Sequence, residues 1–237
     1  MNDFLVYLIV FLAADLALFS GFALGTILTP VFILFFDIKI AIFFVAIVHL
    51  LNNLLKLILF RQHINLTILK RFGFAAVVGS FLGALGQVYM INAVLQHVVG
   101  FVLIILGLQE WIPAKFQFRI PKSIDPIGGF LSGLLGGLVG NQGAIRSAFL
   151  LNYEISKEAF IATGVVLACI IDLIRIPIYW FSYAHAQITN WSALLPLIAF
   201  TFLGTLAGKP LLKYFSVSQF RKLVAALVIL IGVYFIF

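Results

Sequence analysis

The stretch SGLLGGLVGNQGAIRS, at residues 132–147, interrupts one of the longest apolar segments of the sequence with glycines and polar side chains. The segment that contains it, about 124–152, is too long for one bilayer crossing of roughly 20 residues and too short for two. We therefore expect a broken helix or a re-entrant hairpin here. A half-helix beginning near Ala144 would point its positive end and its free N–H groups at the membrane centre, where they favour an anion.

The polar side chains of this stretch extend that prediction. The five glycines let backbone amides approach a ligand closely, Asn141 and Gln142 add hydrogen-bond donors, and Arg146 adds positive charge. The alternative is a glycine-rich packing break in which Arg146 only orients the hairpin. We favour a role in substrate binding.

The composition places the whole chain in a membrane. Of 237 residues, 64% are hydrophobic and only 10% are charged, whereas a soluble domain carries about 25% charged residues. The single cysteine, Cys169, excludes disulfides and metal sites built on cysteine clusters, and we expect no metal and no cofactor. The net charge of +7 lies in short loops, which marks topology rather than a nucleic-acid partner.

Apolar segments of bilayer length run at about 4–36, 40–60, 72–90, 93–112, 124–152, 157–181, 191–208 and 217–237. Cytoplasmic loops carry an excess of Lys and Arg. Here the basic residues fall in three loops, with Arg61, Lys70 and Arg71 in one, Lys115, Arg119 and Lys122 in another, and Lys209, Lys213, Arg221 and Lys222 flanking a third. The loops near 90–93 and 182–190 carry neither residue type.

This charge distribution requires 124–152 to enter and leave on the cytoplasmic face, and 4–36 to do the same from outside. The predicted fold is therefore an all-α integral membrane protein of two inverted repeats, each with a broken-helix or re-entrant hairpin and three transmembrane helices. The repeats span 1–112 and 124–237, joined by a cytoplasmic linker at 113–123. Weak internal matches agree, such as residues 20–22 with 132–134. Inverted repeats with broken helices are common in secondary transporters, which bind substrate near the midplane.

Polar residues at bilayer depth are costly and therefore mark candidate sites. His49, Asn52, Asn53 and Lys56 follow helical spacing and share one face. They either form interhelical hydrogen bonds, with Lys56 extending to the cytoplasmic end of its helix, or bind substrate.

Asp172 and Arg175 lie three residues apart and can form a structural ion pair. Arg175 also occupies the repeat position of Lys56 to within one residue, and two cations placed about a midplane suit an anion path. The predicted substrate-binding residues are Asn141, Gln142, Gly143, Arg146, Asn52, Asn53, Lys56, Arg175, Ser20 and Thr26. Asp172 and His49 are hypothetical proton carriers, and we assign no catalytic residue.

The run from Ser132 to Leu151, followed by SKEAFIATG at 156–164, resembles the TauE/SafE sulfite exporter family of membrane permeases. Residues 20–30 followed by Lys39-x-Ala41 are a weaker form of the same motif. The resemblance implies transport of sulfur-containing anions such as sulfite, thiosulfate or organosulfonates, with both hairpin tips at the site. Thr26-Ile27-Leu28 replaces the glycine run expected in the first tip. We therefore expect the second tip to contribute more of the substrate site than the first.

We therefore expect a multi-pass permease of the plasma (inner) membrane that moves a small anion by alternating access between the repeats. An anion channel, a membrane-embedded enzyme without a recognisable catalytic set, and a scaffolding subunit are the alternatives. An enzyme would need a nucleophile–base set, a metal cluster or a pair of carboxylates inside the membrane. The four scattered histidines and the two aspartates at bilayer depth indicate none of these. The expected partners are the anion and the lipid bilayer, and a homo-oligomer is left open.

Overall fold

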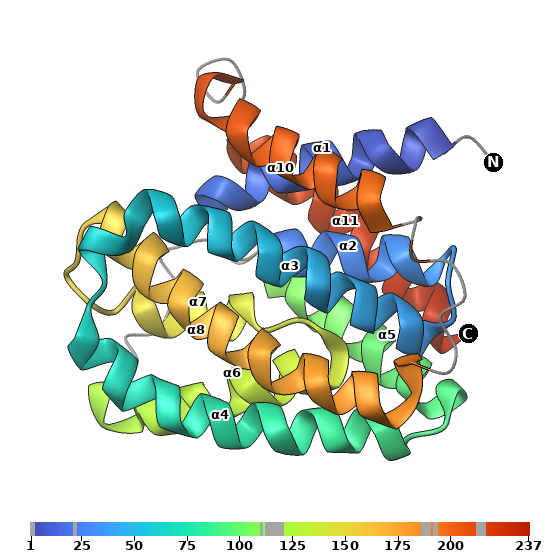
Figure 1. Ribbon diagram of the computed structural model, residues 1–237, viewed down its shortest axis with the longest axis horizontal. Helices are drawn as coiled ribbons and strands as arrows, with labels where there is room; N and C mark the ends of the chain where they lie inside the picture. The colour runs from blue at the N-terminus through green and yellow to red at the C-terminus, as the bar shows by residue number, and fades with distance from the viewer. Residues whose placement is uncertain are drawn as a thin grey trace.

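The computed structural model describes residues 3–20, 23–109, 111, 121–185, 191, 194–211 and 217–237, and contains no strand within these ranges. The helices, shown in Figure 1, are α1 (Asp3–Ser20), α2 (Ala23–Ile33), α3 (Ile38–Phe60), α4 (Leu66–Tyr89), α5 (Asn92–Gln109), α6 (Asp125–Val139), α7 (Gly143–Leu150), α8 (Lys157–Tyr179), α10 (Leu194–Leu211) and α11 (Val217–Ile236). Short turns η1 (Arg61–His63), η3 (Lys122–Ile124) and η4 (Trp180–Ala184) adjoin them.

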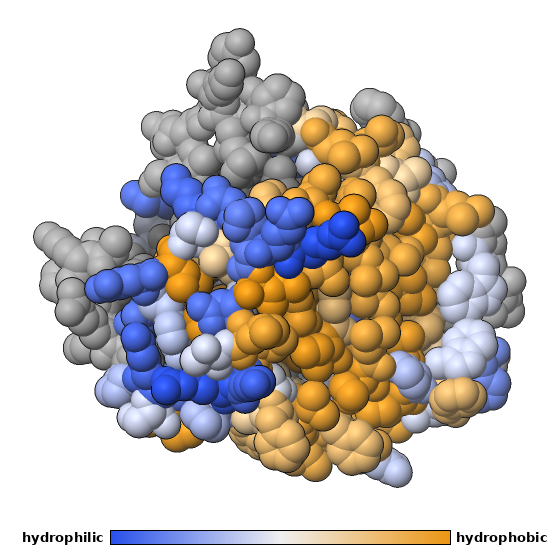
Figure 2. Space-filling view, turned by 60° about the vertical axis from the view of Figure 1, so that its left-hand side comes forward, coloured by the Kyte–Doolittle hydropathy of each residue, from blue (hydrophilic) through white to orange (hydrophobic). Residues whose placement is uncertain are grey.

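The prediction of an all-helical membrane protein is confirmed. Within the described residues, four helical segments are long and apolar enough to cross a bilayer: Ile38–His63, Leu66–Tyr89, Asn92–Gln109 and Lys157–Ala184. Large hydrophobic side chains such as Phe74, Phe101 and Leu195 lie exposed on the outside. Figure 2 shows one side of the surface, on which a broad hydrophobic face is bordered by hydrophilic residues, as expected where lipid is the solvent.

Both over-long apolar segments form two helices rather than one. In the second half, α6 ends at Gly140, whose φ of 83° lies in the left-handed region that favours glycine. The N–H of Gly140 still donates to Gly136 O at 3.1 Å, which closes the helix. After Asn141 and Gln142, α7 begins at Gly143, one residue before the predicted start. In the first half, α1 ends at Ser20 and α2 begins at Ala23.

The helix contacts of the two halves correspond to each other. In chain order, α1 to α5 take the places of α6, α7, α8, α10 and α11. The packing of α1 on α10 then matches that of α6 on α4, and α2 on α3 matches α7 on α8, while α3 with α8 and α5 with α11 pair across the halves (Figure 1). Two related copies require such a correspondence. Their inverted orientation and their boundaries stay predictions, and most of the linker at 113–123 lies outside the described residues.

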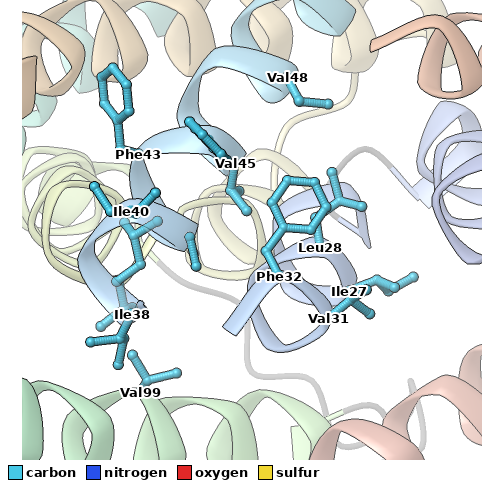
Figure 3. Close-up of a cluster of buried hydrophobic side chains, with 14 of the residues drawn as sticks. Ile27, Leu28, Val31, Phe32, Ile38, Ile40, Phe43, Val45, Val48 and Val99 are labelled. Atoms are coloured by element: carbon cyan, nitrogen blue, oxygen red, sulfur yellow. The ribbon is translucent and has the colours of Figure 1, made fainter. Parts of the chain in front are cut away.

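A hydrophobic cluster holds the first broken segment against its neighbours. Figure 3 shows Leu28 and Phe32 of α2 on the side of α3 that carries Val45, and Val99 of α5 beside Ile38 at the start of α3. These side chains are buried, and they fix α2 at the centre of the protein, next to the α6–α7 break.

Glycines bring α4 and α6 into direct backbone contact. A side chain on Gly133 would collide with the α4 backbone, where Ser80 N would lie 2.8 Å from the added Cβ, and one on Gly79 would collide with the α6 backbone near Phe130. Such small-residue contacts let membrane helices approach closely. They position α6, and therefore the loop that follows it.

We expect Gly133→Ala to destabilise the protein by about 1–3 kcal/mol, because the α4 backbone cannot move aside as a side-chain end can. Gly73→Ala is the matched control, since the nearest atoms there, on Leu167 and Leu69, would lie 3.7 Å from the new Cβ. Thermal unfolding in detergent checks this. Equal melting temperatures for the two variants would contradict a backbone contact at Gly133.

Cysteine labelling tests the predicted orientation. In a Cys169→Ala background we expect an impermeant maleimide to label Phe35→Cys from outside the cell, and Glu154→Cys only after permeabilisation. Both positions are exposed. They lie at opposite ends of the bundle, because the N–H of Asn65, just beyond α3, donates to Thr163 near the start of α8 at 2.9 Å. Labelling of both from one side, or of each from the other side, contradicts the inverted hairpins.

Candidate functional site

The loop Gly140-Asn141-Gln142 between α6 and α7 forms a buried tip, hereafter the tip, that packs against α2 and α8. The tip is held in place through the last carbonyls of α6 and its own backbone. Ser132 Oγ donates to Gln142 O at 2.8 Å, Arg175 Nη1 donates to Gly136 O at 3.1 Å, and the Tyr179 hydroxyl donates to Gly137 O. The carbonyl of Gly137 lies in the last turn of α6, where helix ends leave carbonyls without intrahelical partners, and a cation near this end complements the helix dipole. Arg175 therefore caps α6 and lies at the tip.

A carboxylate on α8 joins three parts of the site. Asp172 is fully buried, with an exposed fraction of 0%. Its Oδ1 accepts from Arg175 Nε at 2.9 Å and from Gln142 Nε2 at 3.2 Å, and Arg175 Nη2 lies 2.8 Å away. Its Oδ2 lies 2.7 Å from His49 Nδ1 of α3. The ion pair suggested by the spacing of Asp172 and Arg175 is present, and it connects α3, α8 and the tip.

The polar face of α3 is buried as its spacing indicated. Asn53 Nδ2 lies 3.1 Å from His49 Nδ1, and Asn52 Oδ1 accepts from Thr205 Oγ1 of α10 at 2.6 Å. Interhelical hydrogen bonding therefore accounts for part of the face. Lys56 is only 3% exposed, so its side chain does not extend to the surface as a snorkelling lysine does. The expected extension of Lys56 to the cytoplasmic end is therefore wrong for this structure, while the expected interhelical hydrogen bonding is present at Asn52.

Besides Arg175 at the tip, two further buried cations, Lys56 and Arg146, lie close enough to influence each other. Arg146 is buried beside Gly164 of α8, and its charge acts on Lys56. Lys56 lies seven residues beyond His49, which is about 10 Å along a helix. These two cations therefore lie toward the predicted cytoplasmic end, while Arg175 lies at the tip.

Several buried polar atoms at the tip and on the neighbouring helix α2 have no hydrogen-bond partner among the described residues. They are both side-chain polar atoms of Asn141, Gln142 Oε1 and Thr29 Oγ1. A group of this kind costs about 1–3 kcal/mol, and native proteins contain few of them without a reason. Thr29 and Arg175 both flank Gly140, and Gly25 lies against the carbonyl of Gly140. The unpaired groups of α2 and of the tip therefore face one region.

Charge in this region is predominantly positive. The buried charged side chains among the described residues are Lys56, Arg146, Arg175, Asp172 and Asp125. Asp125 accepts a hydrogen bond from Tyr153 at the far end of α6, whereas Asp172 pairs with Arg175 and its charge also acts on Arg146. Free amide donors at the start of α7, unpaired side chains and excess positive charge together suit a small anion.

The predicted site residues whose side chains are described fall into four groups in space. Those at or beside the tip are Asn141, Gln142, Gly143, Arg175, Asp172, His49 and Asn53. Asn52 is turned to α10, and Lys56 and Arg146 lie further toward the predicted cytoplasmic end. Thr26 is half-buried on α2, and the side chain of Ser20 lies outside the described residues. Their assignment to substrate binding stays a prediction.

The structure adds residues that the sequence analysis did not assign. Thr29 lies three residues after Thr26, and Tyr179 lies four after Arg175, so helical spacing could have identified both. Thr205 of α10 gave no such signal, because its contact with Asn52 joins positions 153 residues apart.

A family model described as Sulfite exporter TauE/SafE matches residues 6–235 of this chain. Comparisons with curated proteins and with solved structures give no match.

Proposed function

Because the chain belongs to the sulfite exporter TauE/SafE family over nearly its whole length, we propose that this multi-pass membrane transporter carries small sulfur-containing anions across the plasma membrane. Sulfite, thiosulfate and organosulfonates are the substrates that we propose. The movement is alternating access between the two halves of the chain.

The observation that carries the proposal is the tip with its unpaired donors. Asn141 is 2% exposed, and neither of its side-chain polar atoms has a hydrogen-bond partner within the described ranges. Hydrogen bonds to a charged group contribute about 1.5–3 kcal/mol each, so an anion that accepts from Nδ2 of Asn141 compensates the cost of burying this amide donor. The first N–H groups of α7 and the guanidinium of Arg175 add donors from other directions.

The spread of these donors favours an oxyanion of sulfur over a carboxylate. Donors from α2, from the tip and from α8 approach the same region from three helices. A sulfite or sulfonate group presents three oxygens in a pyramid, whereas a carboxylate presents two in a plane. The pyramidal group accepts from all three directions at once.

The arrangement of the two halves supports alternating access. The first half contributes α2 and the second half contributes the tip, and they meet where Gly25 lies against the Gly140 carbonyl. On the predicted outer side, an aromatic cluster of Phe43, Trp180 and Trp191 connects α3 to the turn after α8, with ring centroids 5.4–6.3 Å apart. We propose that these contacts separate when the site opens outward.

A binding screen tests the substrate class. We expect sulfite, thiosulfate and methanesulfonate to raise the melting temperature of the purified protein, and acetate to leave it unchanged. A ligand at 100 times its Kd stabilises by about 2.7 kcal/mol, which is readily measured as a thermal shift. The Asn141→Ala variant is expected to lose the shift. Stabilisation by acetate alone, or by none of these anions, contradicts the proposal.

A further inference from the structure

His49 lies between groups with opposite hydrogen-bonding demands. Its Nδ1 is 2.7 Å from Asp172 Oδ2, which can only accept from it while the carboxylate is ionised. The same atom is 3.1 Å from Asn53 Nδ2 and 3.4 Å from Gln142 Nε2, both of which donate. A ring nitrogen of neutral histidine either donates or accepts. A proton on Nδ1 therefore favours Asp172, and its loss favours the two amides.

This proton position is coupled to the tip through two residues. Gln142 contacts both His49 and Asp172, and it directly follows Asn141 in the tip. Arg175 contacts Asp172 and the carbonyl of Gly136. An anion that binds the tip accepts hydrogen bonds from Arg175 and Gln142, which also donate to Asp172. Binding at the tip therefore changes the number of donors that Asp172 retains.

The surrounding charges set the direction of the coupling. The charges of Asp172 and Arg175 on α8 and of Arg146 on α7 act on the His49 ring, and Lys56 lies two turns along α3. Neither α2 nor the described side chains of α10 carry a titratable group. Asp172 favours an imidazolium and the cations oppose it, so an added anion shifts the balance toward protonation. By reciprocity, protonation of His49 strengthens anion binding.

We propose that the His49–Asp172 pair takes up one proton from the aqueous side on which the anion binds, and releases it with the anion on the other side. The protein is then a proton–anion co-transporter. This inference rests on the proposed function, and it adds the coupling ion and the group that binds it.

Proteoliposomes with a trapped pH indicator provide the test. Thiosulfate is the probe, because it stays fully ionised near neutral pH and carries no proton of its own. We expect added thiosulfate to acidify the lumen, and its uptake to rise several-fold as the outside is brought from about pH 8 to about pH 6, because the lower pH supplies the proton that the pair takes up.

His49→Gln retains a side chain that can hydrogen bond but does not titrate. We expect it to exchange thiosulfate across the membrane with neither luminal acidification nor dependence on pH. The matched control is His97→Gln, because His97 is an exposed histidine whose Nδ1 lies 2.6 Å from the carbonyl of Ala93 on its own helix. This variant should behave as wild type.

Each outcome decides the proposal. Thiosulfate uptake by the wild type without luminal acidification overturns proton coupling and leaves anion transport intact. Acidification by His49→Gln equal to that of the wild type overturns the assignment to His49. If the wild type moves neither thiosulfate nor methanesulfonate, the proposed function fails and the coupling fails with it. The wild-type result is decisive even where His49→Gln does not insert.

Discussion

Asn141→Ala is expected to lower anion uptake by about ten- to a hundredfold while leaving the melting temperature of the substrate-free protein unchanged or higher. The loss follows from removing a hydrogen bond to a charged ligand, since about 1.4 kcal/mol corresponds to a factor of ten. The stability follows from the structure, because neither polar atom of Asn141 has a hydrogen-bond partner in the part of the chain that the structure describes. Uptake into proteoliposomes and thermal unfolding in detergent measure the two effects.

The control for Asn141 is Gln62→Ala, which removes an amide from the exposed turn η1. It should leave both uptake and melting temperature unchanged. A large fall in the melting temperature of Asn141→Ala would show that the side chain supports the fold. In that case the unpaired amide does not mark a substrate site.

Asp172→Ala is expected to destabilise the protein by about 3–5 kcal/mol. Removing one partner of a buried ion pair leaves the other charge uncompensated, and here Arg175 is fully buried. His49 and Gln142 lose their acceptor in the same step. Thermal unfolding of the detergent-purified protein gives the measurement.

Two further variants separate the ion pair from a general effect of lost charge. Asp172→Ala combined with Arg175→Met should recover part of the stability, because an apolar replacement of both partners removes the uncompensated charge. Glu154→Ala, at an exposed carboxylate between α7 and α8, should have no effect. If Asp172→Ala unfolds at the temperature of Glu154→Ala, the carboxylate does not hold α3, α8 and the tip together.

Features of the fold set by local chemistry were predictable from the sequence. The break in 124–152 follows from its length and from a glycine that tolerates a left-handed φ, and the structure places the start of α7 within one residue of the prediction. The i, i+3 spacing of Asp172 and Arg175 anticipated their contact, because side chains three apart share a helix face.

Features set by packing between distant helices were not predictable. His49 contacts Asp172 across 123 residues of sequence, and no local pattern indicates that pairing. Lys56 illustrates the same limit. Its distance from the end of α3 allows it to reach the cytoplasmic surface, but the neighbouring helices bury it. The unpaired state of Asn141 likewise depends on where α2, α6 and α8 meet.

Uptake of labelled thiosulfate into proteoliposomes that contain the purified wild-type protein is the most direct test of anion transport. We expect uptake that saturates with concentration, is competed by sulfite and methanesulfonate but not by acetate, and shows counterflow when the lumen is preloaded with unlabelled thiosulfate. Counterflow is a property of a carrier that a channel lacks. Uptake of these sulfur anions no faster than in protein-free liposomes would contradict the proposal.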